Sequence, residues 1–598
     1  MPAISLVSAD SRPAEEAPAP APRITCGPVQ SRAGLAAEAA RVAFGLCIDP
    51  ALVWFRGGWI YRQSFRGPVP DRILFHPDDP RTRRLEDADA LMRGRFRFAG
   101  QTVEARDGSI FDRPMPSLSF AAALHGFDWL RHLEAAGGDL ARRFTLKLTR
   151  QWLKRYARYT RFIWRPEIIA ERLLNLCTYG RFFLANSDLV WRSRLFVSLR
   201  DQAQVLARTI DEAPDGLPRL KSAAALALAG ICLQDSRNAA AGLKRLAIEI
   251  ERQILPDGGH ISRSPEALLE SFRVLSLVQQ ALDHARRPVQ PAVRSGLDRM
   301  APMLRFFRMG DGALALFHGG GEQDARTLAV ALEQDEAAGK PLGHAPYSGF
   351  QRLAAGRTLV VFDSGLPPPG PFSTAAHAGC LAFEMSSGAH RIVVNCGAAA
   401  GGTQEWTRAL RSTPAHSTLT LADTPSARIL TDGALARLLG PRLVDGPGIV
   451  EARRSESPQG LTVEVSHDGY KDRFGVIHRR RIMLSPRGLK LSGVDSLSPA
   501  DPSRTTPNPR AHGLAFAIRF HIHPDVRLSL AKGGGSVILK LPNGEGWRLR
   551  CDSGALAIEE SIYFGGGSPR RAEQLVIGGE WRGEPVECGW LLEQVGSA

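Results

Sequence analysis

Residues 377–397 read HAGCLAFEMSSGAHRIVVNCG, and they indicate the structure of the second half of the chain. Apolar and β-branched residues gather on either side of Ser-Ser-Gly (386–388), a pattern typical of two strands joined by a turn. His377 stands just before the first of these strands, and RSTPAHSTLTLAD (411–423) repeats the arrangement with His416. A histidine in this position is usually a surface or capping residue, but two of them at neighbouring strand starts are candidates for one site.

Similar short runs fill the sequence from about residue 345 onwards, separated by Gly, Pro, Asp and Ser. Examples are TLVVFDSG (358–365), LTVEVSHDGY (461–470), AFAIRFHIHP (515–524) and ALAIEESIYF (555–564). Because these runs follow one another without helical patterns between them, we expect an antiparallel β-sandwich rather than βαβ units. The expected β-domain spans residues 341–598.

The first half of the chain has a helical pattern instead. From about 116 to 335, apolar residues recur every three or four positions, while Gly and Pro fall mostly between segments. Antiparallel helices with brief connections build either a solenoid or a closed ring, and no repeat of fixed period favours the solenoid. We assign residues 26–340 to this domain, with GRFRFAGQTVE (94–104) strand-like at its start, and residues 1–25 to a flexible tail.

The composition restricts the classes of function. Lysine and arginine number 76 against 61 acidic residues, a net charge of +15 that favours nucleic acid, anionic lipid or an acidic polysaccharide as partner. HExxH, GxxxxGK[ST] and GxSxG motifs are absent, which excludes the simplest zinc-protease, P-loop and serine-hydrolase assignments. No apolar run is long enough to span a bilayer, and residues 1–25 lack the pattern of a secretory signal, so the sequence alone predicts a cytoplasmic protein.

Two segments of the helical half carry candidate functional residues. LTRQWLKRYARYTRFIWRPE (148–167) places aromatic residues on one helical stripe and arginines largely off it. This is either an ordinary amphipathic helix or a surface on which rings stack against sugars while arginines bind carboxylates or sulfates. LPDGGHISRSPEALLE (255–270) is either a plain helix start, with Ser264 as N-cap, or a rim where His260 and Arg263 meet a cleft.

Together these segments resemble the heparinase II/III family of polysaccharide lyases. The resemblance rests on residues 377–397, on WTRALRSTPAHST (406–418) and on ILPDGGHISRSP (254–265), and it covers about residues 120–580. It implies a multidomain α and β protein, with an incomplete (α/α) toroid followed by an antiparallel β-sandwich and a substrate cleft between them. The implied reaction is β-elimination across the C4–O4 bond of a uronic acid, in which His377 matches the family's histidine.

Other family positions differ in this chain. The family's Asn, which neutralises the substrate carboxylate, aligns with Leu217-Pro218, and its Tyr aligns with Glu266-Ala267. In members that hold a metal in the sandwich, ligand positions fall here on Gly379 and Asn395, which leaves His416 alone. These departures predict no cofactor, with a divalent metal in the sandwich as the alternative although its ligand positions look lost, and the resemblance transfers the fold better than the mechanism.

Substitutes from the same rim would have to carry the reaction. Arg219, Lys221 or Arg263 would neutralise the carboxylate, and His260 paired with His377 would transfer the protons. The expected site residues are therefore His377, His260 and Arg263 as catalytic groups, with Trp152, Arg155, Tyr156, Arg219, Lys221 and His416 as substrate contacts.

Three functions follow, in decreasing order of expectation. The first is a lyase of acidic polysaccharides. The second is a catalytically degenerate scaffold that binds acidic glycans in envelope or exopolysaccharide metabolism, and the third is nucleic-acid binding. The family resemblance implies a substrate in the periplasm or outside the cell, in conflict with the absence of an export signal.

Overall fold

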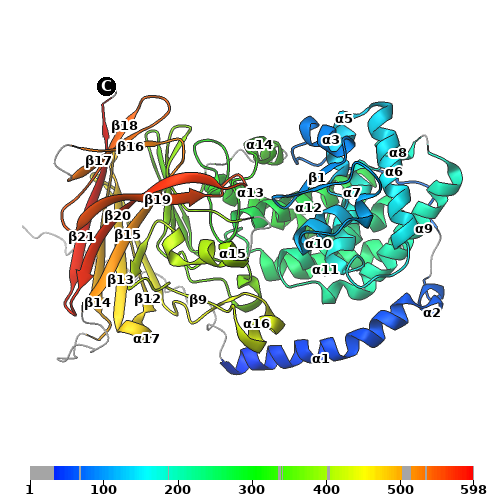
Figure 1. The fold of residues 1–598 in the computed structure, drawn as a ribbon, viewed down its shortest axis with the longest axis horizontal. Helices are drawn as coiled ribbons and strands as arrows, with labels where there is room; N and C mark the ends of the chain where they lie inside the picture. Colours follow the sequence, from blue (N-terminus) through cyan, green and yellow to red (C-terminus); the bar gives the residue numbers. More distant parts are fainter. Residues whose placement is uncertain are drawn as a thin grey trace, which may run out of the picture.

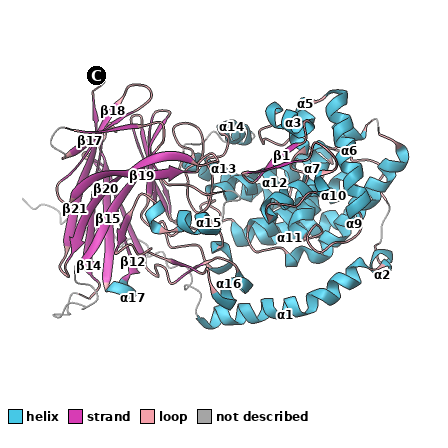
Figure 2. Ribbon diagram, in the orientation of Figure 1, coloured by secondary structure: helices cyan, strands magenta, loops and turns pink. Residues whose placement is uncertain are grey.

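The computed structural model describes residues 32–596 except 66–68, 186, 334–338, 340, 400–403, 502–512 and 532–534. The chain forms two lobes, one helical and one of sheets, that lie side by side (Figures 1 and 2). The structure confirms the expected fold class, a helical toroid followed by an antiparallel β-sandwich. The tail expected over residues 1–25 lies outside the described residues.

The helical lobe is a ring of paired helices. Its elements are α3 (Leu85–Met92), α4 (Leu118–His125), α5 (Leu130–Ala136), α6 (Gly138–Tyr156), α7 (Pro166–Tyr179), α8 (Arg181–Leu184), α9 (Leu189–Thr209), α10 (Leu217–Cys232), α11 (Ser236–Gln253), α12 (Pro265–His284), α13 (Pro291–Phe307) and α14 (Ala325–Glu333). Alanine-rich α10 packs against α7, α11 and α12, and almost its whole length is buried. Gly230 and Gly242 let α10 and α11 touch, because a Cβ at either residue would lie under 2.5 Å from the other helix's backbone.

A small hairpin is inserted on the ring, made of β1 (Arg95–Phe98) and β2 (Gln101–Glu104). It corresponds to the strand-like stretch that the sequence predicts. Phe96 and Phe98 point into the core, while the arginines at 95 and 97 stay exposed, so the alternation of the strand separates an apolar face from a basic one.

The sheet lobe consists of two stacked antiparallel sheets. One has the strand order β19 (Ala555–Tyr563), β20 (Arg570–Trp581), β15 (Leu514–Ile522), β7 (His390–Val394), β6 (Phe383–Ser387), β5 (Thr358–Asp363), β4 (Phe350–Ala355) and β3 (His344–Ala345), with β8 (Leu419–Leu421) also paired to β15. The other has the order β11 (Val450–Ser457), β12 (Gly460–Tyr470), β13 (Val476–Leu484), β14 (Lys490–Pro499), β21 (Val586–Val595), β18 (Gly546–Cys551), β17 (Ser536–Lys540) and β16 (Arg527–Leu530). Their facing sides form one core, in which Phe383 stacks on Trp590.

Short elements decorate the sheets: β9 (Arg428–Ile429) paired with β10 (Leu443–Val444), and the helices α15 (Gln404–Arg411), α16 (Gly433–Leu439) and α17 (Lys471–Phe474). Single-turn 3₁₀ helices lie at Ile110–Asp112, Ile210–Glu212, Gly370–Ser373 and Thr413–Ala415. No helix in the described part of the chain combines the length and apolar composition needed to cross a lipid bilayer.

The two lobes share packing at their junction. The core of the ring continues into Phe350 and Val361 on the first strands of the sandwich. Phe350 packs edge-on against Phe307 of α13 and against Phe317, with ring centroids 4.9 and 5.2 Å apart. The ring and the first strands of the sandwich therefore share one apolar core.

The N-terminal helix α1 (Arg32–Gly57) departs from the expected boundaries, because it lies outside the ring. It runs along one edge of both lobes (Figure 1) and leads into α2 (Trp59–Gln63). At one end, Leu35 and Ala39 pack against α16, and Glu38 forms a 2.9 Å ion pair with Arg442. At the other end, Arg56 forms an ion pair with Glu212 at the ring. We call α1 the strap.

Candidate functional site

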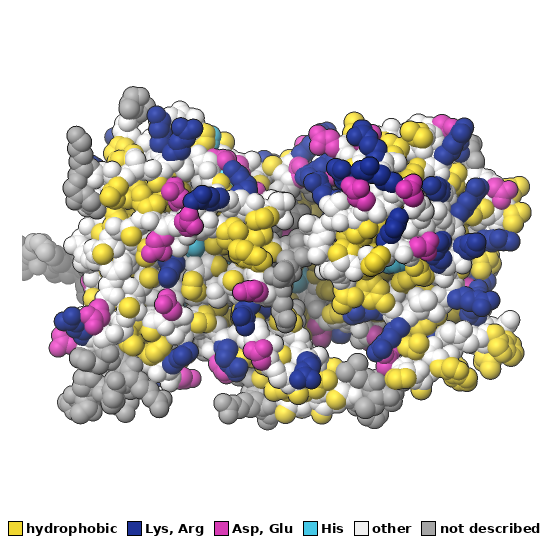
Figure 3. All heavy atoms as spheres, viewed as in Figure 1, with side chains coloured by type: hydrophobic (Ala, Val, Ile, Leu, Met, Phe, Trp, Pro, Cys, Tyr) yellow, Lys and Arg dark blue, Asp and Glu magenta, His cyan; other side chains and the backbone are white. Residues whose placement is uncertain are grey.

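The cleft between the lobes encloses a hollow of about 710 Å³. The ring contributes Arg81, Arg131, Glu266 and Glu270 to its wall, and the sandwich contributes the glycine turn 565–567. The surface is notched where the two lobes meet (Figure 3). This is where the resemblance places a substrate, so each expected site residue can be located relative to it.

The structure brings His377 and His416 together, as expected for one site. His377 Nδ1 lies 3.0 Å from His416 Nε2, and the rings meet edge to face. Below them, Arg480 donates to the carbonyl oxygens of Leu381 and Ser417, and so fixes the two strand starts that carry the histidines.

The hydrogen bonds determine which nitrogens of this pair carry protons. His416 Nδ1 lies 2.8 Å from the Ser412 carbonyl oxygen, which only accepts, so His416 Nδ1 carries a proton and its Nε2 accepts from His377. His377 Nε2 is then the unprotonated nitrogen, and no partner is found for it among the described residues. Burial lowers the pKa of His416 to about 4 and that of His377 well below its usual value, so both rings are neutral near pH 7.

The residues beside this pair do not fit a metal ion. A Cβ at Gly379 would lie 2.7 Å from His416 Cδ2, so the imidazole fills the space that a side chain at residue 379 would need. The Asn395 amide is used within the protein: Nδ2 donates to the Leu316 carbonyl, and Oδ1 accepts from the Ser417 N–H. Within the described residues, no group of three or more His, Cys, Asp or Glu side chains is arranged to hold a metal.

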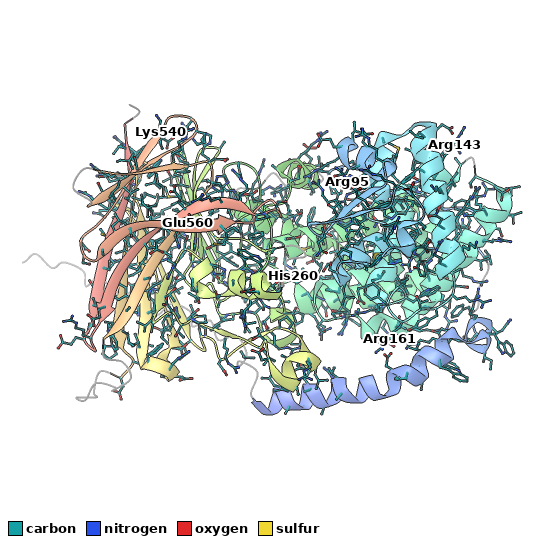
Figure 4. The ribbon with its side chains drawn as sticks, viewed as in Figure 1. Arg95, Arg143, Arg161, His260, Lys540 and Glu560 are labelled. Atoms are coloured by element: carbon teal, nitrogen blue, oxygen red, sulfur yellow. The ribbon has the colours of Figure 1, made fainter. Side chains whose placement is uncertain are left out.

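His260 lies at the junction of the lobes (Figure 4) but is enclosed by protein. Its ring nitrogens lie 2.7 Å from Ser262 Oγ and 3.0 Å from Gln253 Oε1, and burial lowers its pKa to about 4. No hydrogen bond among the described residues joins it to His377. Its observed contacts are those of a histidine that shapes the turn before α12, so the paired proton transfer that the sequence predicts stays a prediction.

Arg263 is a buried link between the lobes. It has a positive φ of 59°, and its guanidinium forms an ion pair with Asp363 of β5. It also donates to the carbonyl oxygens of Ser348, Gly349 and Leu366 at 2.7, 2.9 and 2.9 Å. With its donors committed to the sandwich, Arg263 has little left to offer a substrate carboxylate in this conformation.

Lys221 lies next to the cleft residue Glu270 in a network of partly buried charges. Its ammonium contacts Glu171 and, at 3.1 Å, Glu270. Glu270 is also held by Arg273 at 2.9 Å, and these two cations keep its pKa well below the usual value although burial opposes this. Two carboxylates thus already neutralise Lys221. Arg219, at the start of α10, pairs with Asp215 at 2.6 Å and donates to the Ala213 carbonyl.

The aromatic and basic helix is part of the ring's core, which corrects the expectation of exposed rings. Trp152 is 1% exposed and donates its indole N–H to His125, so it cannot stack on a sugar. Tyr156 is half-buried against Phe111, and Arg155 binds both carboxylate oxygens of Asp112. The stripe that the sequence shows is therefore the buried face of α6, as for an ordinary amphipathic helix.

The cleft wall contains acidic residues that sequence reasoning did not select. Glu266 accepts from the Gly321 N–H at 2.8 Å, and burial raises its pKa. Glu266 and Glu270 are four residues apart on α12 and therefore share a face, a signal that could have placed them together. With Glu322 and Asp324 also present, the charged lining contains five acidic side chains and three arginines.

Comparisons with known proteins agree with this geometry. The family described as "Heparinase II/III-like, C-terminal" matches residues 337–591. A relative from Caulobacter vibrioides (strain NA1000 / CB15N), "FtsZ-localized protein C", is 36% identical over 549 residues, which are 90% of this chain and 93% of the relative. Among solved structures, heparinase III has a TM-score of 0.67 at 14% identity, covering 96% of this chain and 93% of that one. A mutant of the heparan sulfate lyase HepC from Pedobacter heparinus has a TM-score of 0.57 at 17% identity, with the same coverage.

Proposed function

We propose that this chain, which belongs to the heparinase II/III family, is a scaffold with a lyase fold that no longer performs β-elimination. We also propose that it acts where FtsZ is localised. The observation that carries this is the state of two candidate cations, Arg263 and Lys221, which lie outside the cleft lining and are already paired with carboxylates. β-Elimination needs a group that neutralises the uronate carboxylate, so that the C5 proton becomes more acidic. The lining offers this carboxylate more negative charge than positive.

The association with FtsZ rests on the relative. Identity of 36% over nine-tenths of both chains supports a shared role, and the relative's name describes a protein localised with FtsZ. The solved lyases are under 20% identical and support the shared fold alone. We therefore infer that the lyase fold serves here as a frame for binding at the division site.

Two measurements test the proposal. Purified protein is mixed with a panel of uronic-acid polymers while the absorbance of the unsaturated product is followed, with a heparinase III as positive control. We expect no product. A fluorescent fusion in the native host is expected to co-localise with FtsZ, and product formation or a uniform distribution of the fusion would contradict the corresponding half of the proposal.

β-Elimination remains a second candidate because of one observation. The hydrogen bonds of the histidine pair leave His377 Nε2 as an unprotonated nitrogen, which is the form that a general base requires. If the panel yields product, His377→Ala should slow the reaction by about 10²–10⁴-fold without lowering the melting temperature in proportion. Equal rates for both proteins would assign the residual activity to another group.

A further inference from the structure

A second concave surface begins where the cleft ends. A hollow of about 410 Å³ shares Arg84, Arg131 and the glycines 566 and 567 with the cleft, and shares Arg95 with a third hollow of about 750 Å³. The 410 and 750 Å³ hollows flank the β1–β2 hairpin and reach α6, and we call them together the hairpin groove. Figure 3 shows lysine and arginine side chains gathered over the part of the ring where α3 and β1 lie.

The hairpin groove has the opposite charge balance from the cleft. Seven arginines and lysines line it, against three acidic side chains. Two of the acidic residues pair with cations of the same lining, Asp128 with Arg131 and Asp87 with Arg97 at 3.0 Å, which leaves five cations against Glu86. The lining therefore retains a net positive charge along its whole length.

Several donors in the groove have weak partners or none. Arg95 and Arg106 share one exposed carboxylate, Glu104, at 3.5 and 3.2 Å, contacts that contribute little in water. No ion pair is found for Lys147 among the described residues. Gln151 accepts from Ser109 through Oε1, and no partner for its Nε2 donors is found among the described residues. These groups are free to meet the anionic and hydroxyl oxygens of a ligand.

The apolar side chains of the groove indicate which polyanion it suits. Phe96 and Phe98 are buried and Phe144 is half-buried, so the lining offers no exposed ring on which a nucleic-acid base could stack. The largest exposed rings of the described chain, Trp54 and Trp59, lie outside the groove. Arginine forks and a lysine around a shallow trough match sulfates and carboxylates that recur along a chain.

We infer that the hairpin groove, rather than the cleft, binds a linear acidic glycan. The inference goes beyond the proposed function, since most of the groove's lining lies outside the cleft. The choice of an acidic glycan rests on the arginines and the lysine of the lining and not on the proposed function. A glycan that spans both hollows should gain affinity with its length, because each added acidic sugar meets a further cation.

The test uses the full chain and fluorescent heparin oligosaccharides of four and twelve sugars, measured by anisotropy at 50 and 200 mM salt. The groove variant replaces Arg95, Arg106 and Lys147 by Gln, all of them exposed side chains. The matched control replaces Arg143, Arg161 and Lys540 by Gln, with the same change in net charge at sites elsewhere on the molecule (Figure 4).

We expect the groove variant to bind the 12-mer about tenfold more weakly, with a reduced salt slope, and the control to change by less than about threefold. The loss should be smaller for the 4-mer. Equal losses in both variants, no binding by the native protein, or displacement of the 12-mer by single-stranded DNA at lower charge concentration would overturn the inference. Co-localisation with FtsZ and the absence of lyase product are read separately, so failure here leaves the proposed function to its own tests.

Discussion

The cleft and the hairpin groove are neighbours, yet they use charge in opposite ways. Beside the cleft, Arg263 is buried and joins the two lobes through Asp363, and Lys221 is paired with Glu171 and Glu270 within the ring. In the groove, Arg95, Arg106 and Lys147 are exposed and loosely paired, so they are available to a ligand. These exposed basic residues therefore lie beside the cleft between the lobes and not at the place where the fold family binds its substrate. Variants that remove the same kind of charge from the two regions should therefore have different effects.

The largest effect is expected for Arg263→Met. Removal of a buried guanidinium leaves the Asp363 carboxylate uncompensated, which should lower the free energy of unfolding by about 3–5 kcal/mol. Urea denaturation followed by circular dichroism measures it. Arg95→Met, the same change at an exposed groove residue, should cost less than about 0.5 kcal/mol. Similar losses for both would erase the distinction between the two regions.

Gly379→Ala tests whether the His416 ring fills the former ligand position. The added methyl group would meet His416 at 2.7 Å, and the overpacking should cost about 1–3 kcal/mol. Gly566→Ala is the matched control, since a Cβ there meets nothing within 4 Å. In the His416→Ala background, Gly379→Ala should cost much less. An unchanged cost in that background would show that the ring is not the obstacle.

Acid should lower the free energy of unfolding through His416 and leave the cations of the hairpin groove charged. The pKa of His416 falls from about 6.5 when unfolded to about 4 when folded, because of burial. Since the unfolded chain binds the proton more readily, stability is full above pH 6.5 and falls as the pH drops towards 4. From pH 7.5 to 5.5 this residue should contribute a loss of roughly 1.4 kcal/mol.

Denaturation of the native protein and of His416→Gln at both pH values measures this contribution, and the variant should show the shallower dependence. Heparin 12-mer binding should change little over the same range, because Arg and Lys keep their charge. A pH dependence that is identical in both proteins would remove His416 from the explanation.

The smallest effect is expected for Lys147→Gln alone. One exposed cation should change the affinity for the heparin 12-mer by about two- to threefold at low salt and less at high salt. The melting temperature should stay unchanged. Lys540→Gln in the sandwich serves as the single-residue control. An equal loss of affinity there would show that the net positive charge of the protein, and not the groove, attracts the heparin.

The order of the lobes could be predicted from the sequence because the hydrophobic period changes from helical to strand-like, and burial follows that period. The His377–His416 pair could be predicted because each residue precedes a strand of the same sheet, although these strands, β6 and β8, are not paired with each other. The prediction that Trp152 contacts a substrate was wrong, because this residue is on the buried face of α6. The sequence of the stripe did not by itself separate a buried aromatic face from an exposed one. Arg263 shows the same limit, since its ion-pair partner Asp363 lies 100 residues away in sequence.

The hairpin groove was missed for a related reason. Its cations come from the two residues that flank α3, from β1, from the loop after β2, from α5 and from α6, and no single stretch of sequence shows them as a cluster. Residues 51–115 have a mixed composition that predicts only a segment leading into the helical domain. The groove forms because this segment, which contains the β1–β2 hairpin, folds against α6.

The strap sets the mechanics of the molecule. A helix of 26 residues is about 39 Å long, and its two ends are fastened to different lobes, although Pro50 removes one backbone hydrogen bond near the ring end. The lobes therefore cannot swing apart like jaws unless one fastening gives way first. Two ion pairs fasten the strap to the ring, Arg56 with Glu212 and Asp49 with Arg161 at 2.6 Å, while Glu38 and Arg442 join it to the sandwich. A change in the angle between the lobes would therefore have to break the ion pairs at one end of the strap.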